Sequence, residues 1–146
     1  MAETLAERFD AEVAAGFIRA NERLTGLPKF LGLRIVEIGP GTLRAEMVVR
    51  DELLTPFKNV HGGVISAVCD HVLGCVCYPV MKRGQWAATT EFKLNLLAPV
   101  AAGTITADAT IVSLARTQAV VRIDVSNEGR LCAIAQGTVT IRDPKL

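Results

Sequence analysis

The spacing of apolar side chains predicts an amphipathic helix near the start of the chain. Apolar residues recur there at every fourth position, at Leu5, Phe9, Val13 and Phe17. This spacing places them on one face of an α-helix. Thr4 and Glu7 fit a capping box at its start. Gly26 and Pro28 predict its end, so we expect a helix over about residues 4–25 that covers a sheet or a subunit edge.

From Leu33 onward, apolar and polar residues mostly alternate, which is typical of β-strands. The alternation predicts strands at residues 33–38, 42–50, 86–97, 104–113, 119–126 and 131–142. Short breaks separate the last four, so we expect these four to pair in chain order as an antiparallel meander. In the segment 86–97 the alternation assigns one face to Ala88, Thr90, Phe92, Leu94 and Leu96.

Between the two groups of strands lies the longest apolar run, from Val64 to Met81. Its length is close to that of a membrane span, but it contains Asp70, His71 and Pro79, which favour a buried helix of a soluble protein. Pro79 is expected to kink this helix or end it early. One long helix with a large antiparallel sheet predicts an α+β architecture, and residues 1–146 are expected to form a single domain.

Composition narrows the classes of partner. The chain has 146 residues, of which 50% are hydrophobic, and a net charge of +1. An apolar fraction above the usual level favours burial against a second copy of the chain. The small charge gives no bulk attraction to nucleic acid or to an anionic membrane. No basic, apolar leader opens the chain, so we expect a cytoplasmic protein.

The cysteines and histidines do not have the spacing of a metal site. Three of the four cysteines lie in the central apolar run, and all four are expected to be reduced core residues: Cys69, Cys75, Cys77 and Cys132. The helical residues between His61 and His71 span roughly 15 Å, which one ion cannot bridge within a chain. We therefore expect no metal.

The candidate chemistry lies at the head of the central helix, in His61-Gly62-Gly63. Two glycines at a helix start leave backbone N–H groups bare, where the helix dipole amounts to about half a positive charge. Such an end can stabilise a carbonyl oxygen that is becoming an oxyanion. Asp70 follows within an apolar segment, where an unpaired carboxylate is costly, and this favours a catalytic role for it.

These residues, together with the strand from Thr89 to Pro99, resemble the hotdog-fold acyl-CoA thioesterases. The likeness covers about residues 30–142 and is greatest to the phenylacetyl-CoA (PaaI-like) and 4-hydroxybenzoyl-CoA thioesterases. It implies a long central helix wrapped by a curved antiparallel sheet of about five or six strands. It also implies dimers that join their sheets, and often tetramers made from two such dimers.

The resemblance assigns catalytic roles residue by residue. Asp70 matches the catalytic acid, which acts as general base or nucleophile. Gly62 matches the backbone N–H that polarises the thioester carbonyl, and His61 supports its loop. Thr89 lies where relatives place a Ser or Thr that helps to hold the attacking water.

The same resemblance suggests substrate contacts and shows two departures. Thr55 stands where many relatives have Asn or Gln, and Asn59 is a candidate to compensate for it. His71, beside the catalytic acid, is the second departure. Gly63 belongs to the same substrate-binding loop. Arg116, in a predicted hairpin turn, is our candidate for the coenzyme A phosphates, although solvated charges are common in turns.

Helix geometry predicts that the site is shared between two subunits. Gly62 and Asp70 are roughly 12 Å apart along the helix axis, beyond the reach of an aspartate side chain. A second copy with its helix antiparallel would bring its own Asp70 to this Gly62. One helix face carries mainly small residues, at Gly63, Ser66, Ala67, Asp70 and Gly74. That face could approach a partner helix closely or simply pack on the sheet.

We therefore expect an acyl-CoA thioesterase without a cofactor, coenzyme A being part of the substrate. The loop of residues 53–57 and the helix residues Val68 and Leu73 are candidates for an acyl pocket, with a core role equally open. Two alternatives remain. One is a hydratase or dehydratase that pairs His61 or His71 with Asp70. The other is a non-enzymatic acyl-CoA binding module.

Overall fold

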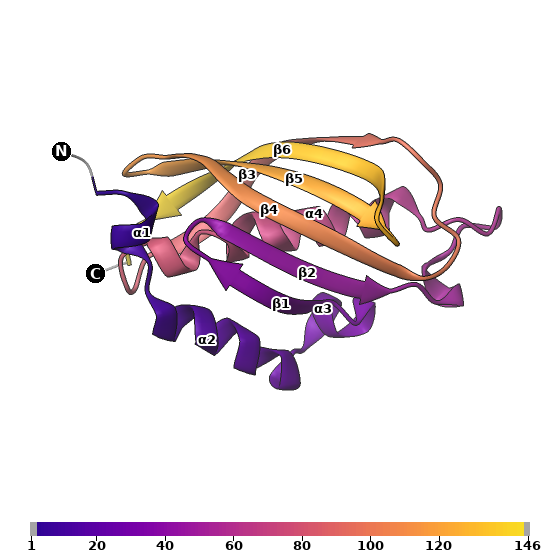
Figure 1. The fold of residues 1–146 in the computed structure, drawn as a ribbon, viewed down its shortest axis with the longest axis horizontal. Coiled ribbons are helices and arrows are strands. Elements are labelled where there is room, and N and C mark those ends of the chain that lie inside the picture. The colour runs from indigo at the N-terminus through magenta and orange to yellow at the C-terminus, as the bar shows by residue number, and fades with distance from the viewer. Residues whose placement is uncertain (1–2, 145–146) are drawn as a thin grey trace.

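The central helix lies in the hollow of one curved sheet. A computed structural model describes residues 3–144 of the chain. The helix, α4, spans Gly62–Cys75, and a short 3-10 helix, η3, follows at Tyr78–Val80. In Figure 1 the strands arch over α4, and the N-terminal helix α2 (Ala11–Ala20) lies alongside β1 (Arg34–Gly39), the strand at one edge of the sheet. The layered α+β architecture is therefore confirmed.

Six antiparallel strands form the sheet, as the alternation of residues predicts. They are β1 Arg34–Gly39, β2 Thr42–Val48, β3 Trp86–Leu96, β4 Thr104–Leu114, β5 Gln118–Asn127 and β6 Arg130–Arg142. Their order across the sheet is β1-β2-β4-β5-β6-β3. The predicted meander of the last four strands is wrong in one respect, because β3 pairs with β6 and not with β4. Residues 97–103 therefore carry the chain from one edge of the sheet back to its middle.

The core forms where α4 packs on the concave face of the sheet. Buried side chains of α4 lie on the side of the helix that faces the strands: Ile65, Val68, Cys69, Val72 and Leu73. Several strands present alanine toward this core, at Ala45, Ala107, Ala119, Ala133 and Ala135. Small side chains let a helix approach a sheet closely, and the burial of apolar side chains in this core is the main favourable contribution to folding.

α4 ends earlier than the apolar run. Its last residue is Cys75, and Pro79 lies within η3. Proline has no N–H to donate to the carbonyl four residues before it, which prevents the helix from continuing through this point. The prediction that Pro79 would end the helix early is confirmed.

The single N-terminal helix predicted over residues 4–25 is wrong. The segment forms α1 Leu5–Arg8, α2 Ala11–Ala20, the 3-10 helix η1 Asn21–Arg23, and α3 Gly26–Leu31. The capping box of Thr4 and Glu7 is present. The break arises because Asp10 caps a new helix, its carboxylate accepting from the N–H groups of Glu12 and Val13. Gly26 and Pro28 lie inside α3, and the left-handed Gly32 ends it.

The two edges of the sheet differ in how their hydrogen-bonding groups are satisfied. At β1, the Asn21 side chain donates to the Ile35 carbonyl (2.7 Å) and accepts from the Ile35 N–H (3.0 Å), as a neighbouring strand would. At β3, the Ala87 N–H donates to Tyr78 Oη (3.3 Å). The other outward main-chain groups of β3 have no partner among residues 3–144. Most of the outer side of β3 is therefore open to pairing.

A β-bulge in β3 reverses the face on which its residues lie. The register shifts between Thr89 and Glu91, so the strand has one residue more than its partner there. Ala87, Phe92 and Leu94 pack on the core. The predicted face that joined Ala88 and Thr90 to Phe92 is therefore wrong, because the inserted residue shifts the alternation by one.

One segment of the chain meets a simple length and hydropathy criterion for a membrane span. It covers Gly62–Val80, and more than half of it is buried inside the fold. The core helix of a globular domain has the same composition, so this segment gives only weak support for a span.

The packing of β3 on β6 generates a test at Gly137. A Cβ at this glycine would lie against Phe92 and within 2.5 Å of the Glu91 carbonyl oxygen. We expect Gly137→Ala to lower the free energy of unfolding by about 1 to 3 kcal/mol, measured by urea denaturation. The control Gly16→Ala, in an open position of α2, should instead gain about 0.5 to 1 kcal/mol. Equal stability of the two variants would contradict the close packing of β3 on β6 at Gly137.

Candidate functional site

His61 caps the start of α4 with its own ring. Its Nδ1 accepts a hydrogen bond from the Gly63 N–H (2.8 Å), so in the neutral ring the proton is on Nε2. Its carbonyl oxygen accepts from the N–H groups of Val64 (2.9 Å) and Ile65 (3.4 Å). The predicted role of His61 in supporting this loop agrees with these contacts.

The Gly62 N–H is the remaining donor at this helix end. The three N–H groups that follow it are all bonded to His61, and no atom of residues 3–144 accepts from Gly62. A Cβ at this position would lie 2.8 Å from Leu96 Cδ1, at the end of β3. Glycine therefore permits close packing while leaving one N–H free in the positive field of the helix dipole.

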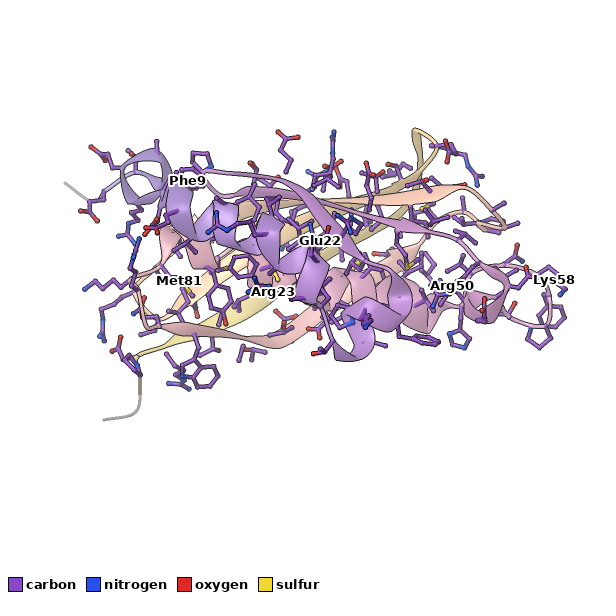
Figure 2. The ribbon with its side chains drawn as sticks, turned by 90° about the horizontal axis from the view of Figure 1, so that it is seen from below. Phe9, Glu22, Arg23, Arg50, Lys58 and Met81 are labelled. Carbon is purple, nitrogen blue, oxygen red and sulfur yellow. The ribbon has the colours of Figure 1, made fainter. Side chains whose placement is uncertain are left out.

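The loop before His61 is held by its own hydrogen bonds. The Thr55 N–H donates to the Asn59 carbonyl (2.7 Å), and Thr55 Oγ1 accepts from the Phe57 N–H (3.2 Å). At its tip Lys58 has a left-handed backbone, and Phe57 is 87% exposed. Figure 2 shows Lys58 at the opposite end of the molecule from Phe9 and Met81. Thr55 and Asn59 thus fix the loop that leads into the helix.

Asp70 lies on the face of α4 that points away from the sheet. It is exposed in the single subunit, so the expected burial is wrong for one subunit alone. The apolar neighbours of Asp70 in the sequence predicted burial for it as well. In the structure the buried residues of α4 lie on the side of the helix opposite to Asp70. No cation of residues 3–144 forms an ion pair with Asp70. Seven residues of helix lie between it and Gly62, and the eight helical steps amount to roughly 12 Å along the axis.

His71 is a half-buried neighbour of Asp70. Its Nε2 lies 3.6 Å from Cys75 Sγ, one helical turn further on. Burial lowers the pKa of His71, while the nearby Asp70 carboxylate acts in the opposite direction. A lowered pKa keeps the ring neutral at neutral pH, so it brings no positive charge to the site.

Thr89 and Arg116 lie away from the Gly62 end. Thr89 is opposite the buried Val139, and residues opposite each other in an antiparallel pair share a face, so Thr89 points to the helix side. Arg116 is exposed in the β4–β5 turn. That turn lies level with the start of β3, because Gln118 and Ala88 both pair with Thr140. Within one subunit, Arg116 and Gly62 are therefore at opposite ends of the sheet.

The four cysteines are free and buried, as predicted. Burial raises the pKa of Cys69, Cys75 and Cys77 to about 12, and it raises that of Cys132 as well. Such thiols are not activated nucleophiles. Across the described part of the chain, no three His, Cys, Asp or Glu side chains form a group that could hold a metal ion.

Three of the seven predicted acyl-pocket residues belong to the core, and the rest of the loop 54–57 is half-buried or exposed. Leu53, Val68 and Leu73 are at most 2% exposed. A cavity of about 200 Å³ lies elsewhere, between the start of α4 and residues 96–100. This cavity was not predicted from the sequence. The apolar residues beyond the end of β3 were a signal for it, because connections between strands are usually polar.

Three comparisons with known proteins bear on this arrangement. The family model described as "Thioesterase superfamily" matches residues 57–134. A Haemophilus influenzae protein that carries an esterase name is 30% identical over 115 residues, which cover 76% of this chain and 81% of the relative. The 1,4-dihydroxy-2-naphthoyl-CoA hydrolase of Listeria monocytogenes is 25% identical over 118 residues, covering 80% of this chain and 96% of that enzyme.

Solved structures share the fold. The thioesterase HI1161 of Haemophilus influenzae superposes with a TM-score of 0.81 at 24% identity, over 98% of this chain and 93% of the other. The E. coli PaaI protein from the phenylacetic acid degradation operon gives a TM-score of 0.81 at 21% identity, over 92% of this chain and 96% of that chain. At these identities the likeness establishes the hotdog fold.

The burial of the thiols leads to a chemical prediction. A thiol with a pKa of about 12 is almost entirely protonated at pH 8, and the thiolate is the reactive form. We expect the native protein to react with a disulfide reagent such as DTNB at least about 100-fold more slowly than a free cysteine. In guanidinium all four thiols should react at once. Rapid reaction of the native protein would contradict the burial described above.

Proposed function

Because the chain belongs to the thioesterase superfamily, we propose that it hydrolyses acyl-coenzyme A thioesters in a site that two subunits form together. It is a thioester hydrolase, and the proposal concerns its substrate and the residues that act. One observation supports the proposal of a shared site. The free N–H of Gly62 and the carboxylate of Asp70 are on the same helix but roughly 12 Å apart along its axis. A second subunit with an antiparallel α4 would supply the missing acid.

In this proposal each group has one task. The Gly62 N–H donates to the thioester carbonyl oxygen as negative charge develops on it. Asp70 of the partner subunit acts as general base, taking a proton from water as that water attacks the carbonyl carbon, and the C–S bond then breaks. Alternatively, the carboxylate attacks the carbonyl carbon itself, the C–S bond breaks to leave an anhydride, and water hydrolyses this anhydride to the free acid and Asp70. In both routes the coenzyme A thiolate takes up a proton. Thr89 helps to hold the water.

Other predicted residues position these groups or bind the substrate. His61 leaves Gly62 as the free donor by engaging the Gly63 N–H. Thr55 and Asn59 brace the loop before it. In an antiparallel dimer the Arg116 end of one subunit would lie near the Gly62 end of the other. Arg116 therefore remains our candidate for the coenzyme A phosphates.

The sheet edges support a dimer through β3. On β1, Asn21 bonds both main-chain groups of Ile35 and α2 packs against the strand, whereas most outward groups of β3 are unsatisfied within the described chain. Pairing of β3 with β3 of a second copy would satisfy them and join the two sheets. It would also bring together the small-residue faces of the two α4 helices, which remain exposed or half-buried in one subunit. A tetramer of two such dimers stays an expectation from the resemblance.

The oxyanion role predicts different effects of two substitutions at Gly62. Gly62→Pro removes the N–H, and proline suits the first position of a helix, preceded here by the extended His61. Gly62→Ala adds the same Cβ against Leu96 but keeps the N–H. We expect Gly62→Pro to lower kcat for an acyl-CoA by about 10²- to 10³-fold more than Gly62→Ala, measured by thiol release. Equal losses would argue against the donor role.

The shared site predicts that two inactive variants restore each other. Asp70→Asn should lower kcat by about 10²- to 10⁴-fold. Asp70→Asn and Gly62→Pro subunits, refolded together, should regain about a quarter of wild-type activity, because half the dimers are mixed and each mixed dimer has one intact site. Each variant refolded alone is the control. If the mixture stays as inactive as its components while mixed dimers form, the site is not shared.

A further inference from the structure

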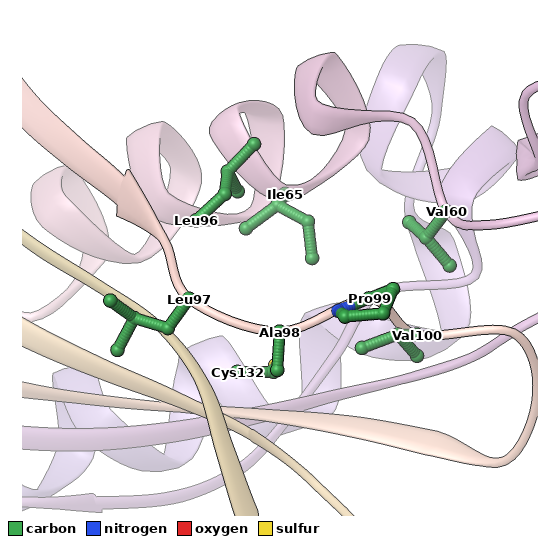
Figure 3. Close-up of a pocket in the computed structure, with 8 residues that line it drawn as sticks. All are labelled: Val60, Ile65, Leu96, Leu97, Ala98, Pro99, Val100 and Cys132. Carbon is green, nitrogen blue, oxygen red and sulfur yellow. The ribbon is translucent and has the colours of Figure 1, made fainter.

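The cavity near Gly62 has no role in the function proposed above. It has a volume of about 200 Å³ and is lined by Val60, Ile65, residues 96–100 and Cys132. Figure 3 shows Leu96 and Ile65 on one side of the space and Pro99 and Val100 on the other. The cavity therefore opens between the first turn of α4 and the connection that leaves β3.

Leu96 connects the cavity with Gly62, which carries the free donor of the helix. It lines the cavity, and its Cδ1 is the atom that a Cβ on Gly62 would meet at 2.8 Å. A thioester carbonyl bound to the Gly62 N–H would thus place one of its two substituents next to this space. The substituents are the acyl group and the sulfur that leads to pantetheine.

The chemistry of the lining distinguishes these two substituents. All lining side chains are aliphatic except the thiol of Cys132, which donates to the Val125 carbonyl (3.3 Å). Some main-chain groups around the cavity have partners. The N–H groups of Leu97 and Ala98 donate to the Cys132 carbonyl, and the Pro99 carbonyl accepts from Arg130. The amides of pantetheine would find no polar side chain here except the Cys132 thiol, whereas a hydrocarbon needs no such partner.

The size of the cavity limits the group that fits. An apolar cavity of about 150 Å³ is enough to bind benzene. A volume of about 200 Å³ therefore holds a single aromatic ring or a chain of about six carbons. The exposed parts of Leu96 (57%) and Leu97 (52%) gain an apolar contact when such a group is bound.

We propose that this cavity is the acyl-binding pocket and selects apolar acyl groups of about six carbons or one unsubstituted ring. The proposal rests on the proposed acyl-CoA hydrolysis at Gly62 and adds the substrate class. An acyl group with a hydroxyl at its far end is disfavoured, because the buried hydroxyl finds no hydrogen-bond partner among the lining side chains.

The test compares acyl-CoA substrates on the full-length chain. For the wild type, kcat/KM for hexanoyl-CoA should exceed that for 6-hydroxyhexanoyl-CoA by about 10- to 100-fold. Ala98→Leu fills the pocket and should lower the ratio of kcat/KM for hexanoyl-CoA to that for acetyl-CoA by about 10- to 100-fold. Ala101→Leu makes the same change in the same connection, at an exposed residue outside the lining, and should leave both values unchanged.

A second variant keeps the test decisive if Ala98→Leu does not fold. Leu97→Ala shortens a half-exposed side chain at the rim and should raise the preference for decanoyl-CoA over hexanoyl-CoA by about threefold or more. Unchanged ratios in the folded variant, or equal rates with the hydroxylated substrate, would overturn the pocket alone. If the wild type releases thiol from no acyl-CoA, the proposed function itself fails.

Discussion

The packing of α4 into the concave face of the sheet is the constraint on which the other features depend. It fixes which side of the helix is buried and therefore directs Asp70 outward. It also sets the first turn of the helix against the end of β3, where Leu96 meets Gly62. Because the strands carry alanine beneath the helix, this contact is close.

The hydrogen bonds that cap the start of α4 leave only one N–H group of its first turn free among the described residues. A helix end has several unsatisfied N–H groups, and a histidine cap that accepted from the wrong one would remove the reactive donor. Here His61 engages the three N–H groups that follow Gly62. One donor with the field of the helix behind it remains, beside an apolar cavity. In our proposal, the polar and apolar parts of a thioester substrate therefore contact separate surfaces within a few residues of each other.

Separation of the functional groups along one rigid helix explains why association and chemistry are linked in our proposal. A carboxylate cannot be moved by 12 Å within an α-helix without unfolding it. The two edges of the sheet also differ, because Asn21 and α2 lie against β1 while most of the outer side of β3 has no partner within the described chain. Pairing through β3 is therefore the way in which our proposal extends the sheet. That way also brings two copies of α4 together.

Much of the fold and part of the site could be predicted from local sequence signals. Periodicity located the six strands and the core helix, because alternation and helical spacing are properties of neighbouring residues. The glycines after His61 identified the donor, and Pro79 identified the end of the helix. These signals depend only on backbone chemistry within a few residues.

Other features depended on contacts between distant segments. The pairing of β3 with β6, the bulge that reverses the face of Ala88, and the cavity bordered by Cys132 all join residues far apart in sequence. Asp10, a typical helix-capping residue, was a local signal for the break between α1 and α2. The regular apolar repeat through this segment predicted one continuous helix instead. The sequence by itself thus determined the strands, the core helix and the position of its free N–H group. Only the tertiary structure decided which face of each element is buried and what surrounds Gly62, because burial is a property of the packed chain and not of any segment alone.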